Sequence, residues 1–434
     1  MEERIIEKLK GRVEGFEIIV DEILNSLSEF RGDEPYSLET KETKGLGLRV
    51  IKDGKLGFAA TTDPNRIPEL VESTIQIANY GEKVNFTFPK EIPQVKCQLV
   101  NEGVKNTSAA QLFSLGKEII AETKRQFPQF KIDLNLNHTI FRRRLVNSSG
   151  FIGEYEKVSY TLSFIGLIVG DDGLIWIYDY KNLSNGQPFS VLEFVNRQVL
   201  LAQNSLKKVP LETKEYPVIF APSYGLIEFL FPLLVGVNGK NFQKRITPLL
   251  GQEGKEIGSP LLSVYDDGLL DYASGSAPFD GEGIAKGQTP LIEKGVFKNF
   301  LFDLKTASLC GRKSTGNASR SYSSEPLPGA NNLVISPGRG TLLAGIQGIK
   351  EGVLIYEVIG GGQSNVLAGD FSLSVGLGFK IEDGEIKGRV KDCMIAGNFY
   401  EVIKRVSQIG GELKDLGNFY LPFIKFEDVK VTGK

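Results

Sequence analysis

The chain has 434 residues, of which 41% are hydrophobic and 24% charged, the composition of an ordinary soluble globular protein of two or three domains. Its 51 basic and 53 acidic residues leave a net charge of -2, which argues against a broad nucleic-acid surface, and no run reaches the roughly 18 apolar residues of a membrane helix. The three cysteines lie far apart and the single histidine, His138, sits in a strand-like segment, so neither a disulfide framework nor an ordinary zinc site is expected.

The first thirty residues are predicted to form one amphipathic helix. Apolar residues recur there at helical spacing, at Ile5, Ile6, Leu9, Val13 and Phe16. The charged start of this segment is unlike a secretory signal. Together with the sparse cysteines, this predicts a cytoplasmic protein.

A hairpin and a second helix are predicted to follow. Residues 36–63 alternate like strands around Asp53-Gly54, a strong hairpin signal. The next helix is capped by Thr62 or Asp63 and ends at Gly81. Residues 1–83 are therefore assigned to an N-terminal α+β domain, and the proline-containing residues 84–105 to a linker.

Residues 106–208 are predicted to form a central α+β domain. A helix begins after a cap at Asn106, Thr107 or Ser108, and another covers residues 189–208. Between them, turns at 147–150 and 171–173 divide three long antiparallel strands. Arg142, Arg143 and Arg144 are interpreted as solvated residues of one of these strands.

Residues 209–434 are predicted to form a mainly β C-terminal domain. Short strands alternate with glycine-rich turns, including a hairpin at 382–384, and one late helix is expected at 399–413. The fold class is therefore α+β, with N-terminal units of helices and antiparallel sheet followed by a mostly antiparallel β domain.

Two polar segments of this last domain are candidates for function. Asp280 and Glu282, flanked by glycines, could bind a cation or exchange protons, or they could be solvated acids of a surface turn. The long polar loop at 310–338 could present hydroxyl and backbone groups to a peptide, or could be an ordered structural loop. The glycine run 360–362 could expose a strand edge to an extended peptide.

One carboxylate, Glu228, stands within the apolar stretch 224–236, after a strand-like segment that ends at residue 222. Considered alone, it could be a general base, a metal-site residue or a surface residue. Pro232 follows it by four positions.

Several stretches, taken in order along the chain, resemble the PmbA/TldD family, formerly described as modulators of DNA gyrase. Residues 45–63 resemble its N-terminal domain and residues 146–156 its central domain. The C-terminal domain of the family is resembled by residues 275–307, 314–320, 333–338, 369–386 and 395–398. The match runs from about residue 15 to about residue 432.

The resemblance implies a cytoplasmic zinc metalloprotease built from two related subunits. The catalytic type carries His-Glu-x-x-x-His on a helix after a strand and a later cysteine ligand, whereas the PmbA/TldE type lacks this motif. Here residues 224–234 contain no histidine and residues 409–423 no cysteine, and Cys393 lies before the late helix. The resemblance thus predicts a chain without catalytic residues, metal ligands or a cofactor of its own, with zinc in a TldD-like partner.

The expected role is to help form a cavity for a peptide or unfolded-protein substrate, without nucleic acid or membrane. The residues expected to line that cavity are Asp280, Glu282, Ser314, Thr315, Asn317 and Arg320. Glu228 is then expected at a polar helix edge or a subunit contact. The alternatives are a stand-alone homodimeric peptide- or protein-binding regulator without protease activity, and a metal-independent hydrolase that uses Asp280 and Glu282.

Overall fold

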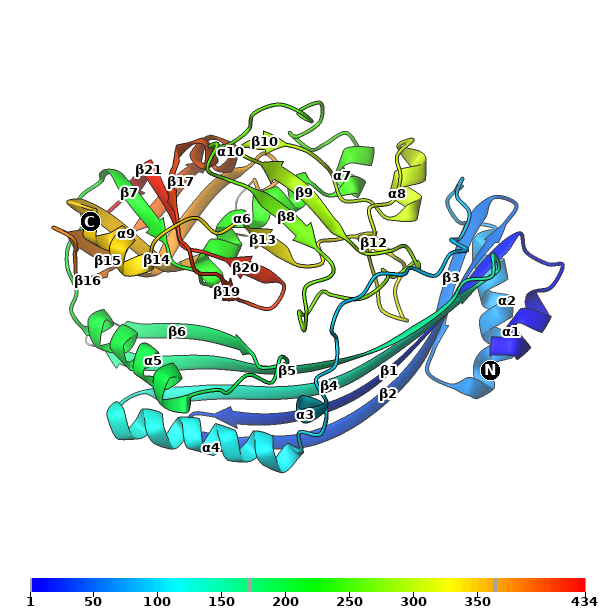
Figure 1. Cartoon of the computed structure of the whole chain (residues 1–434), viewed down its shortest axis with the longest axis horizontal. Coiled ribbons are helices and arrows are strands. Elements are labelled where there is room, and N and C mark those ends of the chain that lie inside the picture. Colours follow the sequence, from blue (N-terminus) through cyan, green and yellow to red (C-terminus); the bar gives the residue numbers. More distant parts are fainter. Residues whose placement is uncertain (1, 171–172, 362–364, 434) are drawn as a thin grey trace.

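A long curved sheet carries most of the N-terminal half, and the mainly β C-terminal half lies over one of its faces (Figure 1). The computed structural model describes residues 2–170, 173–361 and 365–433. The architecture is α+β, as the sequence predicts.

The curved sheet has the strand order β3-β2-β1-β4-β5-β6 and every neighbouring pair is antiparallel. Because β1 pairs directly with β4, strands from before and after the segment 84–105 belong to this single sheet. Its strands are β1 Gly15–Arg31, β2 Glu34–Lys52, β3 Lys55–Thr61, β4 Lys131–Asn147, β5 Ile152–Gly170 and β6 Gly173–Asn182.

The N-terminal helix is much shorter than predicted. Helix α1 covers Glu2–Leu9, and the chain from Gly15 onward is strand β1, so the prediction of one helix through residue 30 is wrong. Tertiary pairing explains the difference, because β1 is a central strand that bonds to β2 on one side and β4 on the other.

The remaining N-terminal elements agree with their sequence signals. The hairpin between β2 and β3 turns at Asp53-Gly54, and both of these residues have a positive φ. Helix α4 (Ala109–Gln126) starts with a capping box at Ser108, and α5 (Val191–Leu206) is capped by Ser190. A 3-10 turn at Pro64–Arg66, capped by Asp63, leads into α2 (Ile67–Ala78), and α3 is Glu102–Lys105. Two predicted features, the turn residues Asp171 and Asp172 and the last glycine of the run at 362, lie outside the described residues.

Across the described ranges, the C-terminal half contains two larger sheets and one small one. The first has the order β14-β7-β21-β17-β15-β16, with β18 beside β21 and with β14 also paired to β15. The second has the order β10-β9-β8-β13-β20-β19, and β11 pairs with β12. The strands are β7 Lys214–Phe220, β8 Val264–Asp267, β9 Gln288–Glu293, β10 Val296–Phe297, β11 Ala318–Ser319, β12 Leu327–Pro328, β13 Leu333–Ile335, β14 Glu351–Ile359, β15 Asp370–Glu382, β16 Glu385–Val390, β17 Met394–Asn398, β18 Val406–Ile409, β19 Lys414–Asp415, β20 Phe419–Leu421 and β21 Ile424–Thr432. The helices are α6 Tyr224–Gly236, α7 Gly239–Gln243, α8 Leu304–Leu309, α9 Leu342–Gln347 and α10 Phe399–Val402.

The late helix is also shorter than predicted. Helix α10 ends at Val402, a 3-10 turn occupies Ile403–Arg405, and β18 then begins. The prediction of a helix through residue 413 is wrong because Val406 and Ile409 pair with β21, and both side chains are buried in the sheet core.

The two halves of the chain share a hydrophobic core. One cluster of buried residues joins α4 and α5 to the curved sheet and continues into β7, β14 and β15 of the C-terminal half. No helix in the ranges that the structure describes is both long and apolar enough to cross a membrane.

Two glycines of β2 allow the C-terminal half to approach the curved sheet closely. A Cβ atom on Gly45 would lie 2.2 Å from the ring of Tyr322, and one on Gly47 would lie 2.2 Å from the backbone oxygen of Tyr322. Glycine is therefore required at both positions by contact with the loop 320–324, since real Cβ atoms do not approach neighbours so closely.

We predict that Gly47→Ala destabilises the protein by about 1–3 kcal/mol, because the added methyl group meets backbone that cannot rotate away. Urea unfolding measures this free energy. The matched control is Gly287→Ala, where an added Cβ meets nothing within 4 Å. Equal stability of the two variants would contradict the close contact with Tyr322.

Candidate functional site

Asp280 lies in the turn between Phe279 and Ala285 and is buried, with 1% of its surface exposed. One carboxylate oxygen accepts hydrogen bonds from the backbone N–H groups of Glu282 (2.9 Å) and Ile284 (3.0 Å), and the other from Ala318 (3.0 Å). The carboxylate thus holds its own turn together and fastens it to β11.

Glu282 connects this turn to the curved sheet. Its carboxylate is fully buried, accepts the backbone N–H of Leu304 at 2.7 Å and accepts Arg49 Nη1 at 2.6 Å. Arg49 lies on β2 and is 1% exposed. Glu282 therefore ties α8 and the acidic turn to β2.

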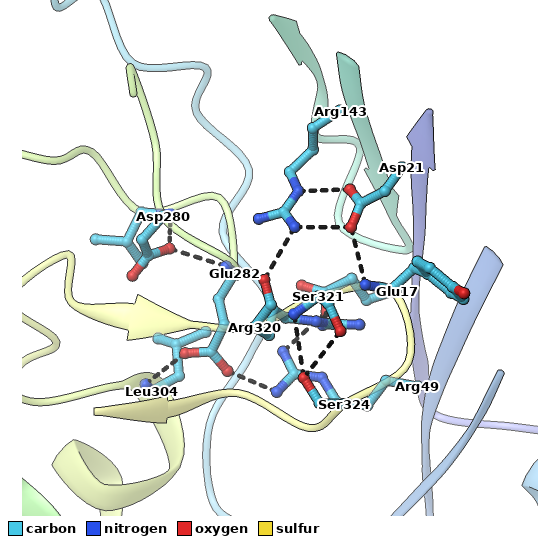
Figure 2. A network of polar contacts seen from close by, with 12 residues as sticks. Glu17, Asp21, Arg49, Arg143, Asp280, Glu282, Leu304, Arg320, Ser321 and Ser324 are labelled. Carbon is cyan, nitrogen blue, oxygen red and sulfur yellow. Dashed lines mark hydrogen bonds and ion pairs between the residues drawn. The ribbon is translucent and has the colours of Figure 1, made fainter. Parts of the chain in front are cut away.

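A buried ion network surrounds this contact (Figure 2). Glu17 Oε1 lies 3.0 Å from Arg49 Nη2 and 2.5 Å from Arg320 Nη1. Asp21 accepts two bonds from Arg143, at 2.8 and 2.9 Å, which is the paired geometry that strengthens such contacts. We call the following six residues the interdomain ion network: Glu17, Asp21, Arg49, Arg143, Glu282 and Arg320.

Backbone contacts extend the network into the long polar loop. Arg143 Nη2 donates to the backbone oxygen of Arg320 at 2.9 Å, and the N–H of Tyr322 donates to Asp21 at 2.8 Å. The loop is thus fixed both to β4 and to β1.

Strand register places these charges on one face of the curved sheet. Glu17 and Asp21 are four residues apart on β1, so with a period of two they point to the same side. Arg49 lies directly opposite Glu17, and Arg143 directly opposite Asp21. That face is the one covered by the C-terminal half (Figure 1).

Burial controls the proton affinities in this region. Loss of solvent raises the pKa of both Asp280 and Glu282, and the attraction of Arg49 opposes the shift at Glu282. Burial, with Arg49 and Arg143 close by, also lowers the pKa of the Arg320 guanidinium. The three acidic and three basic groups of the network balance formally, so loss of any one leaves a buried charge without its counterion.

Ser314, Thr315 and Asn317 fasten the polar loop to other parts of the C-terminal half. Thr315 Oγ1 accepts the N–H of Phe302 at 2.8 Å, and Ser314 Oγ donates to the Phe302 oxygen at 3.2 Å. Asn317 Nδ2 donates to Asp266 at 2.6 Å. These side chains are engaged within the chain.

The structure thus separates the six residues predicted from sequence. A cavity of about 390 Å³ lies between the curved sheet and the loops above it. Of the six predicted residues, all of which the structure describes, only Asp280 and Arg320 line this cavity. The sequence analysis did not identify Glu17, Asp21 or Arg49, and its interpretation of Arg143 as a solvated residue is wrong, because this side chain is buried and paired with Asp21. The available signal was a pair of acids, Glu17 and Asp21, set among the apolar residues of the segment 16–24.

The apolar stretch around Glu228 is helix α6, which packs into the C-terminal core. Phe229 at its centre contacts four other rings, with centroids 4.9–5.3 Å away, those of Phe220, Phe371, Phe399 and Phe426. Glu228 is on the exposed edge of the helix, where a Cβ on Gly361 would come within 2.2 Å of its carboxylate. Its position at a polar helix edge agrees with the sequence-based expectation.

A second carboxylate, Glu357, lies close to the start of α6. It is 8% exposed and sits at an irregularity in the pairing of β14 with β15, next to Tyr356, whose backbone oxygen accepts a hydrogen bond from Ser223 at the cap of α6. Burial, then repulsion by Asp179 and Glu228, raises the pKa of Glu357 to about 8. This group is therefore largely protonated at neutral pH.

Comparison with known proteins identifies the family. Residues 213–433 match the PmbA/TldA metallopeptidase C-terminal domain, and residues 16–78 match PmbA/TldA metallopeptidase domain 1. The chain belongs to the PmbA/TldD family of metallopeptidase-like proteins.

Relatives named TldD and relatives named PmbA or TldE resemble the chain over most of its length. It is 26% identical to the zinc metalloprotease TldD homolog of Saccharolobus solfataricus, covering 86% of this chain and 83% of that protein. It is 25% identical to the metalloprotease PmbA of Escherichia coli O157:H7, covering 99% and 94%. The crystal structure of TldE from Thermococcus kodakarensis superimposes with a TM-score of 0.91 at 25% identity, over 100% of both chains.

The zinc that the family implies does not fit the side chains of α6. This helix offers one carboxylate and no imidazole or thiolate, the donors that zinc prefers. His138 lies on β4 against Tyr160, with ring centroids 6.4 Å apart. Within residues 2–170, 173–361 and 365–433, no three His, Cys, Asp or Glu residues are grouped so that they could hold a metal ion.

The ion network makes a prediction about neighbouring arginines on β4. Arg143→Met leaves Asp21 buried without its counterion and is expected to lower the free energy of unfolding by about 3–5 kcal/mol. Arg142→Met, one residue earlier, removes only an exposed pair with Glu156 and is expected to cost at most about 1 kcal/mol. Urea unfolding of both variants measures the contrast, and a similar loss in both would argue against a buried network.

The buried carboxyl of Glu357 predicts a pH-dependent stability. Its pKa is raised above the unfolded value of about 4.3, so the folded state holds an extra proton and the resulting stabilisation is lost as the pH rises toward 8. Relative to Glu357→Gln, the wild type should lose up to about 1.4 kcal/mol per pH unit between about pH 5 and about pH 8. Unfolding by urea at several pH values tests this.

The control for the loss of one acid is Glu325→Gln, at an exposed position of the polar loop. A stability difference between wild type and Glu357→Gln that stays constant across this pH range would contradict the raised pKa of Glu357.

Proposed function

We propose that this chain is the PmbA/TldE-type, non-catalytic subunit of a cytoplasmic two-part metalloprotease that cleaves peptides or unfolded protein. The observation that carries the proposal is the composition of α6. At the place where the catalytic type has its metal helix, this chain has an apolar helix with one exposed acid. In this proposal, a TldD-like partner supplies the zinc and the groups that activate water.

The packing of α6 supports a structural role for that helix. Leu226, Phe229, Leu230 and Leu233 are each at most 2% exposed, so the side chains that could have been ligands are replaced by core residues. The contribution of this chain is then shape and rigidity, with one wall of the peptide cavity fixed by the interdomain ion network.

The six residues predicted from sequence divide between two roles in this proposal. Asp280 and Arg320 form part of the cavity wall, since both line the cavity under the polar loop. Glu282, Ser314, Thr315 and Asn317 hold the surrounding loops in place through the contacts to Arg49, Phe302 and Asp266.

Reconstitution with a partner that carries His-Glu-x-x-x-His tests the proposal. The purified chain alone is expected to contain no stoichiometric zinc by elemental analysis. Mixed with the partner, it should form a stable complex on size-exclusion chromatography and hydrolyse an unstructured peptide, with activity lost when the partner's motif Glu is changed to Gln.

Three results would separate this proposal from its alternatives. Glu228→Gln should leave the rate of the mixture unchanged, whereas a loss of about 100-fold or more would make Glu228 a general base. Absence of a complex, together with a stable homodimer that binds peptide without cleavage, would favour the stand-alone regulator. Tightly bound zinc in the isolated chain would overturn the proposal.

A further inference from the structure

The cavity beneath the polar loop contains two lysines that the proposed function does not use. Its volume is about 390 Å³, and it lies between the curved sheet and the loops at 274–286 and 318–331. We call it the lysine cavity and define it by six of its lining residues: Arg143, Lys157, Ser276, Asp280, Lys286 and Arg320.

Both ammonium groups are held in place by backbone oxygens of one short segment. Lys157, on β5, donates to the oxygens of Ser274 and Ser276, the latter at 3.2 Å. Lys286 donates to the oxygen of Gly275 at 2.7 Å. An ammonium group has three N–H donors, so one remains on Lys157 and two on Lys286.

Neither lysine forms an ion pair within the described part of the chain, whereas the arginines of the cavity do. Arg143 is paired with Asp21, and Arg320 with Glu17. The carboxylate oxygens of Asp280 accept hydrogen bonds from three backbone N–H groups, two in its own turn and one on β11. The two lysines are thus the cations of this cavity that form no ion pair with another described residue.

The pKa values of the two lysines agree with the absence of an ion pair, since both are lowered. Burial, followed by repulsion from Lys286, lowers the pKa of Lys157 to about 7. Burial lowers the pKa of Lys286 to about 8, although Asp280 and Asp266 attract its charge. An anion placed between the two ammonium groups would relieve this cost.

We propose that the lysine cavity binds a carboxylate, with Lys157 and Lys286 donating to its two oxygens. The neighbouring Asp280 disfavours a doubly charged anion such as phosphate, because a like charge in the wall repels it. The cavity is at the small end of ligand sites, and its walls include Ile23, Phe141 and Phe279 beside the polar groups. It suits the C-terminal residues of a peptide or a small free acid.

The test uses the purified chain alone and therefore does not depend on the proposed subunit assembly. Acetyl-alanyl-alanine with a free carboxylate is titrated calorimetrically against its C-terminal amide, with propionate as a second probe. The free acid should bind at least about tenfold more tightly than the amide. Binding of propionate equal to that of the peptide would assign the site to small acids, and tighter peptide binding would assign it to peptide C-termini.

Variants assign the binding to the two lysines. Lys157→Met and Lys286→Met should each weaken binding of the free acid at least about tenfold, without affecting the amide. Lys41→Met, at an exposed position of the same sheet, serves as the control and should bind as wild type. Equal binding of acid and amide, or no binding of either, would overturn the proposal.

The pH dependence in the wild type tests the site even if a variant fails to fold. The charged and titratable groups that face the lysines are Asp21 on β1, Arg143 on β4, Tyr155 on β5, Asp266 on β8, Asp280 in the turn, Arg320 after β11 and Cys97 in the segment 84–105. Burial raises the pKa of Asp266 to about 6, and that of the Cys97 thiol and the Tyr155 hydroxyl above their ordinary values.

Affinity for the free acid should therefore fall at least about tenfold from about pH 6 to about pH 9, as both lysines lose their protons and Asp266 and Asp280 become fully ionised. Binding near pH 7 should be accompanied by proton uptake, measured from the dependence of the heat on the buffer. A constant affinity over this range would show that the ammonium groups do not bind the ligand.

Discussion

Six charged side chains, buried between the curved sheet and the C-terminal half, hold this molecule in one arrangement. Glu17 touches two arginines, one from β2 and one from the polar loop, so it joins segments that are far apart in the sequence. Buried charges are costly without partners, and the two members of each ion pair come from different elements. The relative position of the two halves is thus specified by charge pairing as well as by the shared hydrophobic core.

The same face of the sheet supplies both the network and the lysine cavity. Moving along the sheet, the cross-strand row that contains Glu17 and Arg49 gives way to the row of Asp21 and Arg143, and then to that of Phe141 and Lys157. In the second row Asp21 and Arg143 pair with each other, and in the first row Glu17 and Arg49 also pair with Arg320 and Glu282 from the loops above. The third contains the ammonium group of Lys157, which donates to backbone oxygens and lines the lysine cavity.

Local signals in the sequence were sufficient for the elements that depend on local chemistry. The turn at Asp53-Gly54 and the cap at Ser108 were predicted because side chain and backbone interact within a few residues. Strand β1 was mistaken for helix because apolar residues at helical spacing, from Ile5 to Phe16, run into its first residues. The arginine partners of Glu17 and Asp21 lie 32 and 122 residues away, so only the fold reveals them. For the same reason, Asp280 and Glu282 were found as candidates while their engagement inside the chain was not.

The bond between Glu17 and Arg320 spans 303 positions of the chain. During synthesis, Glu17 leaves the ribosome long before Arg320, whereas Arg49 and Arg143, which pair with Glu17 and Asp21, belong to the curved sheet itself. The curved sheet can pair its own strands early, but its charged face stays hydrated until the polar loop has been made. Docking of the two halves is therefore completed late in synthesis, and a product truncated before the polar loop exposes a charged face that is buried in the finished protein.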